Sequence, residues 1–355
     1  MQLNEKIEIS FDQIKQLQGV EHVALAQRDG NPIQTSGWFT KTKSLKTKSY
    51  EIFNATSLAS AIFNLGIHLH PQDLKYILIE GKKAKILIAP LNSPLHHSLN
   101  RILEQQVISD HNLEFFITII AQPNTDVEGI FLQIGECLKD IKTTLITSGE
   151  IFKPPLIQFD EKVIQNIIKG FNVKENQNKI KGFDIKENFK LRSFSLNLSE
   201  RISSELRKIL NTFNTAISNL KYAIIAINGG FIASKINNTQ EIMPYQIDNI
   251  AAMSDSLFQT ADQYTWLFKK MSTDTIMLNC DNTFQFIYRL GKVLCKKWFN
   301  LYELGEIVFI TEISKSRQKL GSLRQIVHQI SEKVNILINE IKLHNSNSLG
   351  ELIIN

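Results

Sequence analysis

The chain has 355 residues, of which 43% are hydrophobic and 21% charged, which is typical of a soluble globular protein with room for two domains. Its net charge of +5 is mild, and residues 151–200 carry eight Lys and one Arg against two Asp and four Glu, an excess of +3. Because the remainder has no dense basic surface pattern, we expect no nucleic-acid partner.

Cysteine usage and apolar segments point to the cytoplasm. The three cysteines, Cys137, Cys280 and Cys295, form no CxxC pair, so we expect reduced thiols and neither disulfide nor zinc. The N-terminal residues lack a basic-then-apolar signal pattern, and apolar runs such as Phe115–Ala121 are too short to span a bilayer. The prediction is a cytoplasmic protein whose membrane contact is at most peripheral, through partners.

The first half of the sequence alternates helical and strand patterns. Its first hairpin is indicated by Asp29-Gly30 between two apolar runs, a pair that favours a tight primed turn with positive φ. In chain order the expected elements are a helix over 11–17 ending at Gly19, a hairpin over 22–36, a helix over 50–65, a hairpin over 74–91, a strand over 113–121 and a helix over 127–141. Residues 92–112 are expected to form a loop with a helical turn.

The second half repeats this order about 199 residues later. At that offset Ala24 corresponds to Ala223 and Gly30 to Gly229, which follows Asn228 in a second hairpin turn. The expected elements are a helix over 202–220, a hairpin over 221–234, a helix starting near Pro244, a hairpin over 274–290, a strand over 306–313 and a helix over 320–341. The repeat predicts two similar α+β domains, over 1–146 and 199–344.

A segment of different composition lies between the halves. Over 147–198 adjacent prolines disfavour helix, and IKGFNVKEN at Ile168 recurs as IKGFDIKEN at Ile180. We interpret the segment as a flexible basic linker; a docking peptide anchored by Phe171 and Phe183 is the alternative. Residues 345–355 are expected to form a tail.

The repeated order resembles the roadblock family, the dynein light-chain type of small regulatory domain. The resemblance depends on the turns Asp29-Gly30 and Asn228-Gly229, on NIAAMSDSLFQTA in the second middle helix, and on KLGSLRQIV at 319–327. It implies two domains, each a five-stranded antiparallel sheet with a leading, a middle and a long C-terminal helix. Insertions at 92–112 and 291–304 depart from the shortest family members.

The resemblance also implies a function. Family members are mostly non-catalytic, pair through the middle helix and an edge strand, and often bind or regulate small Ras-like GTPases as activating partners or scaffolds. We therefore expect a non-enzymatic regulator or scaffold for a small GTPase, with stimulation of GTP hydrolysis as one mode of action. The two halves would pair within one chain, or the chain would form a homodimer.

Polar positions of the middle helices are the candidate partner-binding residues. They would lie together on one face of the joined sheet, and they are Ser57, Ser60, Asn64, Asp248, Asp255 and Gln259. A second candidate surface is the lysine-rich stretch with Lys41, Lys43, Lys46 and Lys48, read chiefly as a solvated loop and alternatively as a contact for an acidic partner or anionic lipid headgroups.

No catalytic, cofactor or metal motif is evident. The sequence has no GxSxG, P-loop or HExxH, so it is not itself a GTPase of the P-loop class. The histidines at 68–70 and 96–97 lack companion ligands and are read as surface or loop residues. Arg324 is a candidate arginine finger, with a packing or surface role as the preferred interpretation.

Two other functions remain open. A longin-type trafficking, tethering or nucleotide-exchange module has a similar order but begins directly with the hairpin, so the two leading helices count against it. A small-ligand sensor is the other alternative, since sheet-and-helix domains also build ligand pockets.

Overall fold

The computed structural model describes ten continuous stretches of the chain. They are residues 3–36, 45–71, 74–91, 115–126, 200–217, 219–227, 229–239, 242–297, 300–315 and 320–347, with the isolated positions 130, 135, 137 and 141. Contacts group Met1–Glu150 with Leu198–Leu352 in one compact unit. The predicted linker, its 12-residue repeat with Phe171 and Phe183, the loop over 92–112 and the tail after Asn347 lie outside the described residues.

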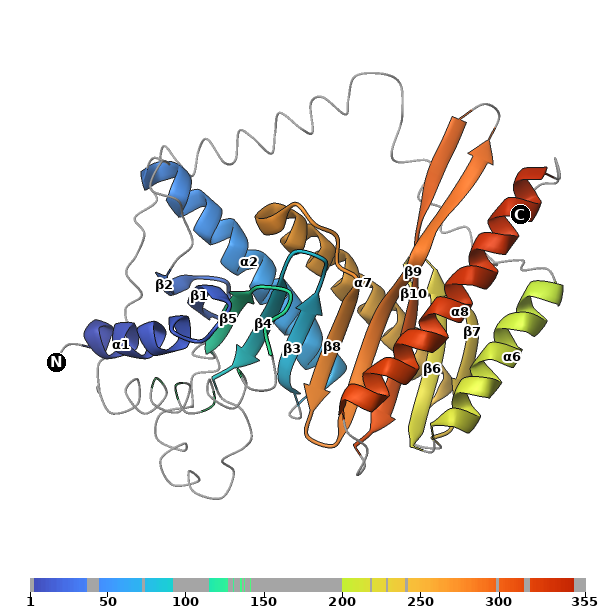
Figure 1. The fold of residues 1–355 in the computed structure, drawn as a ribbon, viewed down its shortest axis with the longest axis horizontal. Helices are drawn as coiled ribbons and strands as arrows, with labels where there is room; N and C mark the ends of the chain where they lie inside the picture. The colour runs from blue at the N-terminus through green and yellow to red at the C-terminus, as the bar shows by residue number, and fades with distance from the viewer. Residues whose placement is uncertain are drawn as a thin grey trace. The chain divides into compact units, whose positions relative to one another are not determined.

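Ten strands form one antiparallel sheet. The first half contributes β1 (Val20–Gln27), β2 (Pro32–Ser36), β3 (Leu74–Glu80), β4 (Lys85–Pro90) and β5 (Phe115–Ala121). The second half contributes β6 (Leu220–Ile227), β7 (Phe231–Asn237), β8 (Thr275–Cys280), β9 (Thr283–Lys297) and β10 (Asn300–Ser314). The order is β2-β1-β5-β4-β3-β8-β9-β10-β6-β7, so each half supplies five adjacent strands (Figure 1). The α+β class and the antiparallel sheet agree with the sequence prediction.

Helices cover both faces of this sheet. The described helices are α1 (Leu3–Lys15), α2 (Leu45–Leu69), α6 (Glu200–Ala216), α7 (Pro244–Lys269) and α8 (Leu320–Asn347). Helices α6 and α8 lie in front of the sheet in Figure 1, and α2 and α7 lie behind it. The isolated positions Ile130 and Ile141 are helical and buried, where a closing helix of the first half is predicted.

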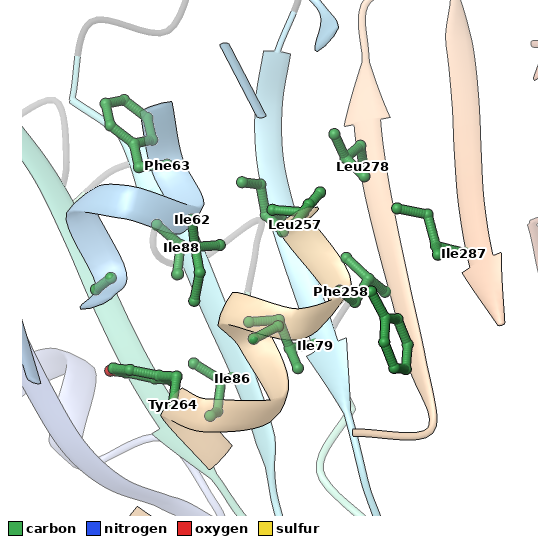
Figure 2. Packing of buried hydrophobic residues seen from close by; sticks show 14 of the residues in the cluster. Ile62, Phe63, Ile79, Ile86, Ile88, Leu257, Phe258, Tyr264, Leu278 and Ile287 are labelled. Carbon is green, nitrogen blue, oxygen red and sulfur yellow. The ribbon is translucent and has the colours of Figure 1, made fainter. Parts of the chain in front are cut away.

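Period-two alternation along the strands supplies an apolar layer to each face. Ile77 and Ile79 belong to the core beneath α2 and α7, together with residues of β8 such as Leu278 (Figure 2). On the other face, Phe213 of α6 packs edge-on against Phe309 of β10, with ring centroids 5.4 Å apart. A strand that is buried on both faces reads as a continuous apolar run, as FFITIIA does.

The two halves meet where β3 pairs with β8. In this antiparallel register Leu78 lies opposite Met277, which follows it by 199 residues, the offset of the sequence repeat. The pair therefore lies on the pseudo-two-fold axis that relates the halves. The ladder satisfies backbone groups that both edges would otherwise expose, and Lys75 adds an ion pair to Asp281 at 2.9 Å.

Several expected boundaries are wrong. Helix α2 begins at Leu45 and not near Tyr50, so Lys46 and Lys48 are helical and not in a loop; no Pro or Gly stops the helix there. Leu220 begins β6, because the leading helix α6 ends at Ala216. Residues 291–304, expected as an insertion, largely extend β9 and β10 into a longer hairpin.

The first hairpin turn also differs from the primed turn expected. The amide of Gly30 donates to the carbonyl of Gln27, and Gly30 has φ +92°, whereas the only non-glycine residue with positive φ in the described part is Lys270. Asp29 therefore keeps negative φ, and the turn is a three-residue loop that closes on a left-handed glycine. In the second hairpin both Gly229 and Gly230 have positive φ.

One helix among the described residues is long and apolar enough to cross a membrane by length and composition alone. It is α2, over Ile52–Leu69, with mean hydropathy 1.3. In the folded unit this helix packs against α7 and against strands of the sheet, and 39% of that stretch is buried. We interpret it as a core helix.

A glycine pair tests the close approach of the second hairpin to α7. A Cβ on Gly230 would lie 2.3 Å from Cα of Ala252, at φ +83°, whereas a Cβ on Gly321 meets nothing within 4 Å. We expect Gly230→Ala to lower the free energy of unfolding by about 2 kcal/mol or more. Gly321→Ala, in a helix, should leave it unchanged or raise it by up to about 1 kcal/mol. Denaturant unfolding measures both, and equal effects would contradict the packing described.

Candidate partner-binding site

The middle helices α2 and α7 pack against each other on one face of the sheet, as expected for the candidate site. Ile62 of α2 and Leu257 of α7 are fully buried in the core beneath them (Figure 2). Tyr264 of α7 is also fully buried, beside Ile86 of the first half, and burial raises the pKa of its phenol. The helix pair is therefore anchored in a core that both halves share.

In the first half, polar side chains of α2 hold the turn of the β1–β2 hairpin. The hydroxyl of Ser60 donates to the carbonyl of Arg28, and Nδ2 of Asn64 donates to the same oxygen at 3.2 Å. Nε of Arg28 donates in return to Oδ1 of Asn64 at 2.6 Å. Ser57 lies under the turn, since a Cβ on Gly30 would be 2.9 Å from its Cα. These contacts tie the hairpin to the helix.

The second half uses the corresponding turn of α7 for the same purpose. Oδ2 of Asp255 accepts a hydrogen bond from the amide of Gly229 at 2.9 Å, and Gln259 follows Asp255 by one turn of α7. Burial raises the pKa of the Asp255 carboxyl, although the hydrogen bond from the Gly229 amide favours its charged form. Ser60 and Asp255 are 5% and 3% exposed, so these two positions face the hairpin and not solvent.

The other predicted positions differ in accessibility. Asp248, near the start of α7, has a side chain 66% exposed, and its Oδ1 lies 3.5 Å from Nζ of Lys235 on strand β7. Ser57, Asn64 and Gln259 are half-buried. Of the six candidates, Asp248 is therefore the side chain most open to a partner, whereas Ser57, Ser60, Asn64 and Asp255 lie at the hairpin turns.

The lysine surface is only partly described. Lys46 and Lys48 lie in the first turns of α2. Lys41 and Lys43 lie outside the described residues. Whether these four lysines contact an acidic partner or lipid remains a prediction.

Arg324 and His70 take part in contacts between the halves. An Nη of Arg324, on α8, donates to Oε2 of Glu80 on β3 at 2.6 Å. Nε2 of His70, just after α2, lies 2.6 Å from Oε1 of Gln285 on β9. Within the described residues no group of three His, Cys, Asp or Glu is placed to hold a metal; His96 and His97 are not among them.

Sequence reasoning missed two features of the site. The first is Arg28, whose backbone and side chain both join the hairpin contacts; a charged residue directly before Asp-Gly was the available signal. The second is the end of α7, where Trp266 is 57% exposed beside Lys270. The helical pattern of α7 does not distinguish that exposed Trp from a core residue.

Comparisons with known proteins return structures alone. No protein-family model matches the chain, and no curated protein does. Among solved structures, the gliding protein MglB from Thermus thermophilus is 12% identical and covers 41% of this chain and 97% of its own, with a TM-score of 0.34. Myxococcus xanthus MglB is 15% identical, over 40% and 96%, with a TM-score of 0.29.

A further match is a roadblock domain by name. "Crystal Structure of Roadblock/LC7 Domain from Streptomyces avermitilis" is 11% identical and covers 38% of this chain and 93% of its own, with a TM-score of 0.28. The family that the sequence resembles is thus among the structures returned.

Two substitutions of Asp255 test its contact with the hairpin turn. Asp255→Leu leaves the amide of Gly229 without its acceptor and should lower the free energy of unfolding by about 1–3 kcal/mol. Asp255→Asn keeps an acceptor oxygen and should leave the free energy of unfolding nearly unchanged at low pH.

The pH dependence of the same pair has a definite sign. Because the native pKa of Asp255 is raised above 3.8, the folded state holds a proton that the unfolded state releases. The stability of the unsubstituted protein should therefore fall, relative to Asp255→Asn, as pH rises from 3.8 through the native pKa. Unfolding curves of both proteins across that range measure the difference, and a constant difference would contradict the assignment.

Proposed function

We propose that this chain is a cytoplasmic, non-enzymatic regulator or scaffold that binds a small Ras-like GTPase through two roadblock-like domains paired within one molecule. The observation that supports it is the junction of the halves, where β3 pairs with β8 and α2 packs against α7. This is the pairing that the family resemblance implies for members that bind GTPases.

The hairpins and the middle helices form a rigid surface. The hydrogen bond that Ser60 donates and the one that Asp255 accepts tie each hairpin to its middle helix, and the shared core fixes the two helices together. A surface that is pre-organised in this way loses little conformational entropy when a partner binds. Regulation then requires different affinities for the GTP and GDP states, because a ligand shifts an equilibrium only by its differential affinity.

The leading helices favour the roadblock interpretation over the longin alternative. α1 buries Phe11 and Ile14, and α6 buries Phe213, so each half begins with a helix that is part of its core. A longin-type module would begin with the hairpin. Among the described residues nothing comparable supports the small-ligand sensor.

The experiment that tests this proposal is capture of GTPases by the immobilised full-length chain. Cytosol from cells of the same species is loaded with a non-hydrolysable GTP analogue or with GDP, and the retained proteins are identified by mass spectrometry. We expect a small GTPase to be enriched in one nucleotide state. Equal recovery in both states would indicate a passive scaffold, and recovery of no GTPase in either would overturn the proposal.

A charge-reversal pair locates the surface. Asp248→Arg changes an exposed side chain at the start of α7 and should lower the affinity for the captured GTPase about tenfold. Glu205→Arg, on α6 at the opposite face of the sheet, is the matched control and should leave the affinity unchanged. If only Glu205→Arg lowered the affinity for the GTPase, the binding surface would lie on the α6 face of the sheet.

A further inference from the structure

The last turn of α7 has no counterpart in α2. Asp255 follows Ser60, its equivalent at the hairpin turn, by 195 residues, whereas Met277 follows Leu78 at the junction by 199. Between these two fixed points the second half therefore holds four more residues, about one turn of helix. This extra turn breaks the symmetry of the two halves, and it ends at Lys269.

The extra turn places apolar side chains in solvent. Trp266 is 57% exposed and Leu267 is 36% exposed. Gln263, Trp266 and Lys270 share one side of the helix by their spacing, and Nζ of Lys270 lies 5.6 Å from the centre of the Trp266 ring. The exposed Trp266 indole is not part of the buried core. In the same region of α7, Tyr264 belongs to that core and the half-buried Phe268 packs against it.

Lysines from the first half surround the same turn. Nζ of Lys83, in the β3–β4 turn, donates to the carbonyl of Lys270 at 3.2 Å, which brings the two exposed lysines together. Lys82, also exposed, precedes it in that turn. The basic turn therefore joins the end of α7 across the junction of the halves.

The neighbouring carboxylates leave this cluster positive. Glu21 is paired with Lys269, and Asp262 is paired with Arg289 at 2.5 Å. Asp274 lies near Lys82, and burial raises the pKa of its carboxyl. Among the described residues no carboxylate stands within ion-pair distance of Lys82, Lys83 or Lys270.

We propose that Trp266, Leu267, Lys82, Lys83 and Lys270 form a docking patch for the surface of an anionic phospholipid membrane. An indole and a leucine beside snorkelling lysines suit the boundary between headgroups and acyl chains. Charge complementarity favours an anionic surface, because among the described residues no carboxylate lies within ion-pair distance of these three lysines. Each lysine near such a membrane contributes roughly a fivefold gain in affinity.

This inference goes beyond the proposed function. It concerns the end of α7 and the β3–β4 turn, and it is separate from the Lys41–Lys48 stretch considered from the sequence. A regulator held at a membrane would meet a membrane-associated GTPase at higher local concentration. Vesicle binding needs no GTPase, so the two proposals fail independently.

The test uses the full-length chain and vesicles of phosphatidylcholine with or without phosphatidylserine. We expect sedimentation with the anionic vesicles only, weakened by added salt. A variant with Trp38→Phe and Trp298→Phe leaves Trp266 as the sole tryptophan. The tryptophan fluorescence of this variant should shift to shorter wavelength when anionic vesicles are added.

Substitutions then separate the contribution of Trp266 to vesicle affinity from that of the lysines. Trp266→Ala should lower vesicle affinity about tenfold. Lys82→Gln with Lys83→Gln and Lys270→Asn should lower it roughly a hundredfold; Asn tolerates the left-handed backbone of Lys270. The matched controls are Tyr245→Ala, at the other end of α7 and 64% exposed, and Lys208→Gln on α6. Neither control should change the affinity.

Three outcomes would overturn the proposal. The first is no binding to anionic vesicles. The second is binding that survives both patch variants, or is lost only when Lys41, Lys43, Lys46 and Lys48 are replaced by Gln. The third is an unchanged vesicle affinity together with loss of GTPase capture by Trp266→Ala, which would make the patch a protein interface. Unfolding curves of each variant confirm that its fold is retained.

Discussion

The antiparallel pairing of β3 with β8 is the interaction on which the rest of the structure depends. It joins two edges whose backbone groups would otherwise be exposed, and it makes ten strands one sheet. The same pairing brings α2 against α7 and places Tyr264 beside Ile86 of the other half. Arg324 of the last helix reaches Glu80 of β3 across it. A substitution in the β3–β8 ladder would therefore disturb the packing of both halves.

In the described sheet the outermost strands are β2 and β7, and each of them belongs to a hairpin that a middle helix holds. Ser60 in one half and Asp255 in the other bind the backbone of the turn, so the edge hairpins are fixed to the same helices that pack together at the junction. One continuous arrangement thus links the outer strands to the centre. The extra turn of α7 departs from this symmetry, and it is there that Trp266 and the lysines collect.

Much of the fold follows from the sequence, because the repeat and the apolar periodicity specify the element order in both halves. The offset of 199 residues even relates the central pair, Leu78 and Met277. The start of α2 was missed because lysine and threonine give weak boundary signals when no Gly or Pro is present. The roles of Ser60 and Asp255 were missed for a different reason: a polar residue on a helix suggests solvent, and its backbone partner, about 30 residues earlier, is visible only in the structure. Trp266 was missed because four extra residues keep the helical phase nearly unchanged.

The measurement that tests the central claim most directly asks whether the two halves pair within one molecule. Glu80 lies opposite Thr275 in the ladder, so Glu80→Cys with Thr275→Cys places two thiols at cross-linking distance. Heavy-isotope-labelled and unlabelled chains are mixed, refolded together and oxidised, and the cross-linked peptides are weighed by mass spectrometry. Pairing within one chain predicts that the disulfide-linked peptides from β3 and β8 are wholly labelled or wholly unlabelled. Peptides of mixed labelling in statistical proportion would show that the halves pair between chains and would contradict the account.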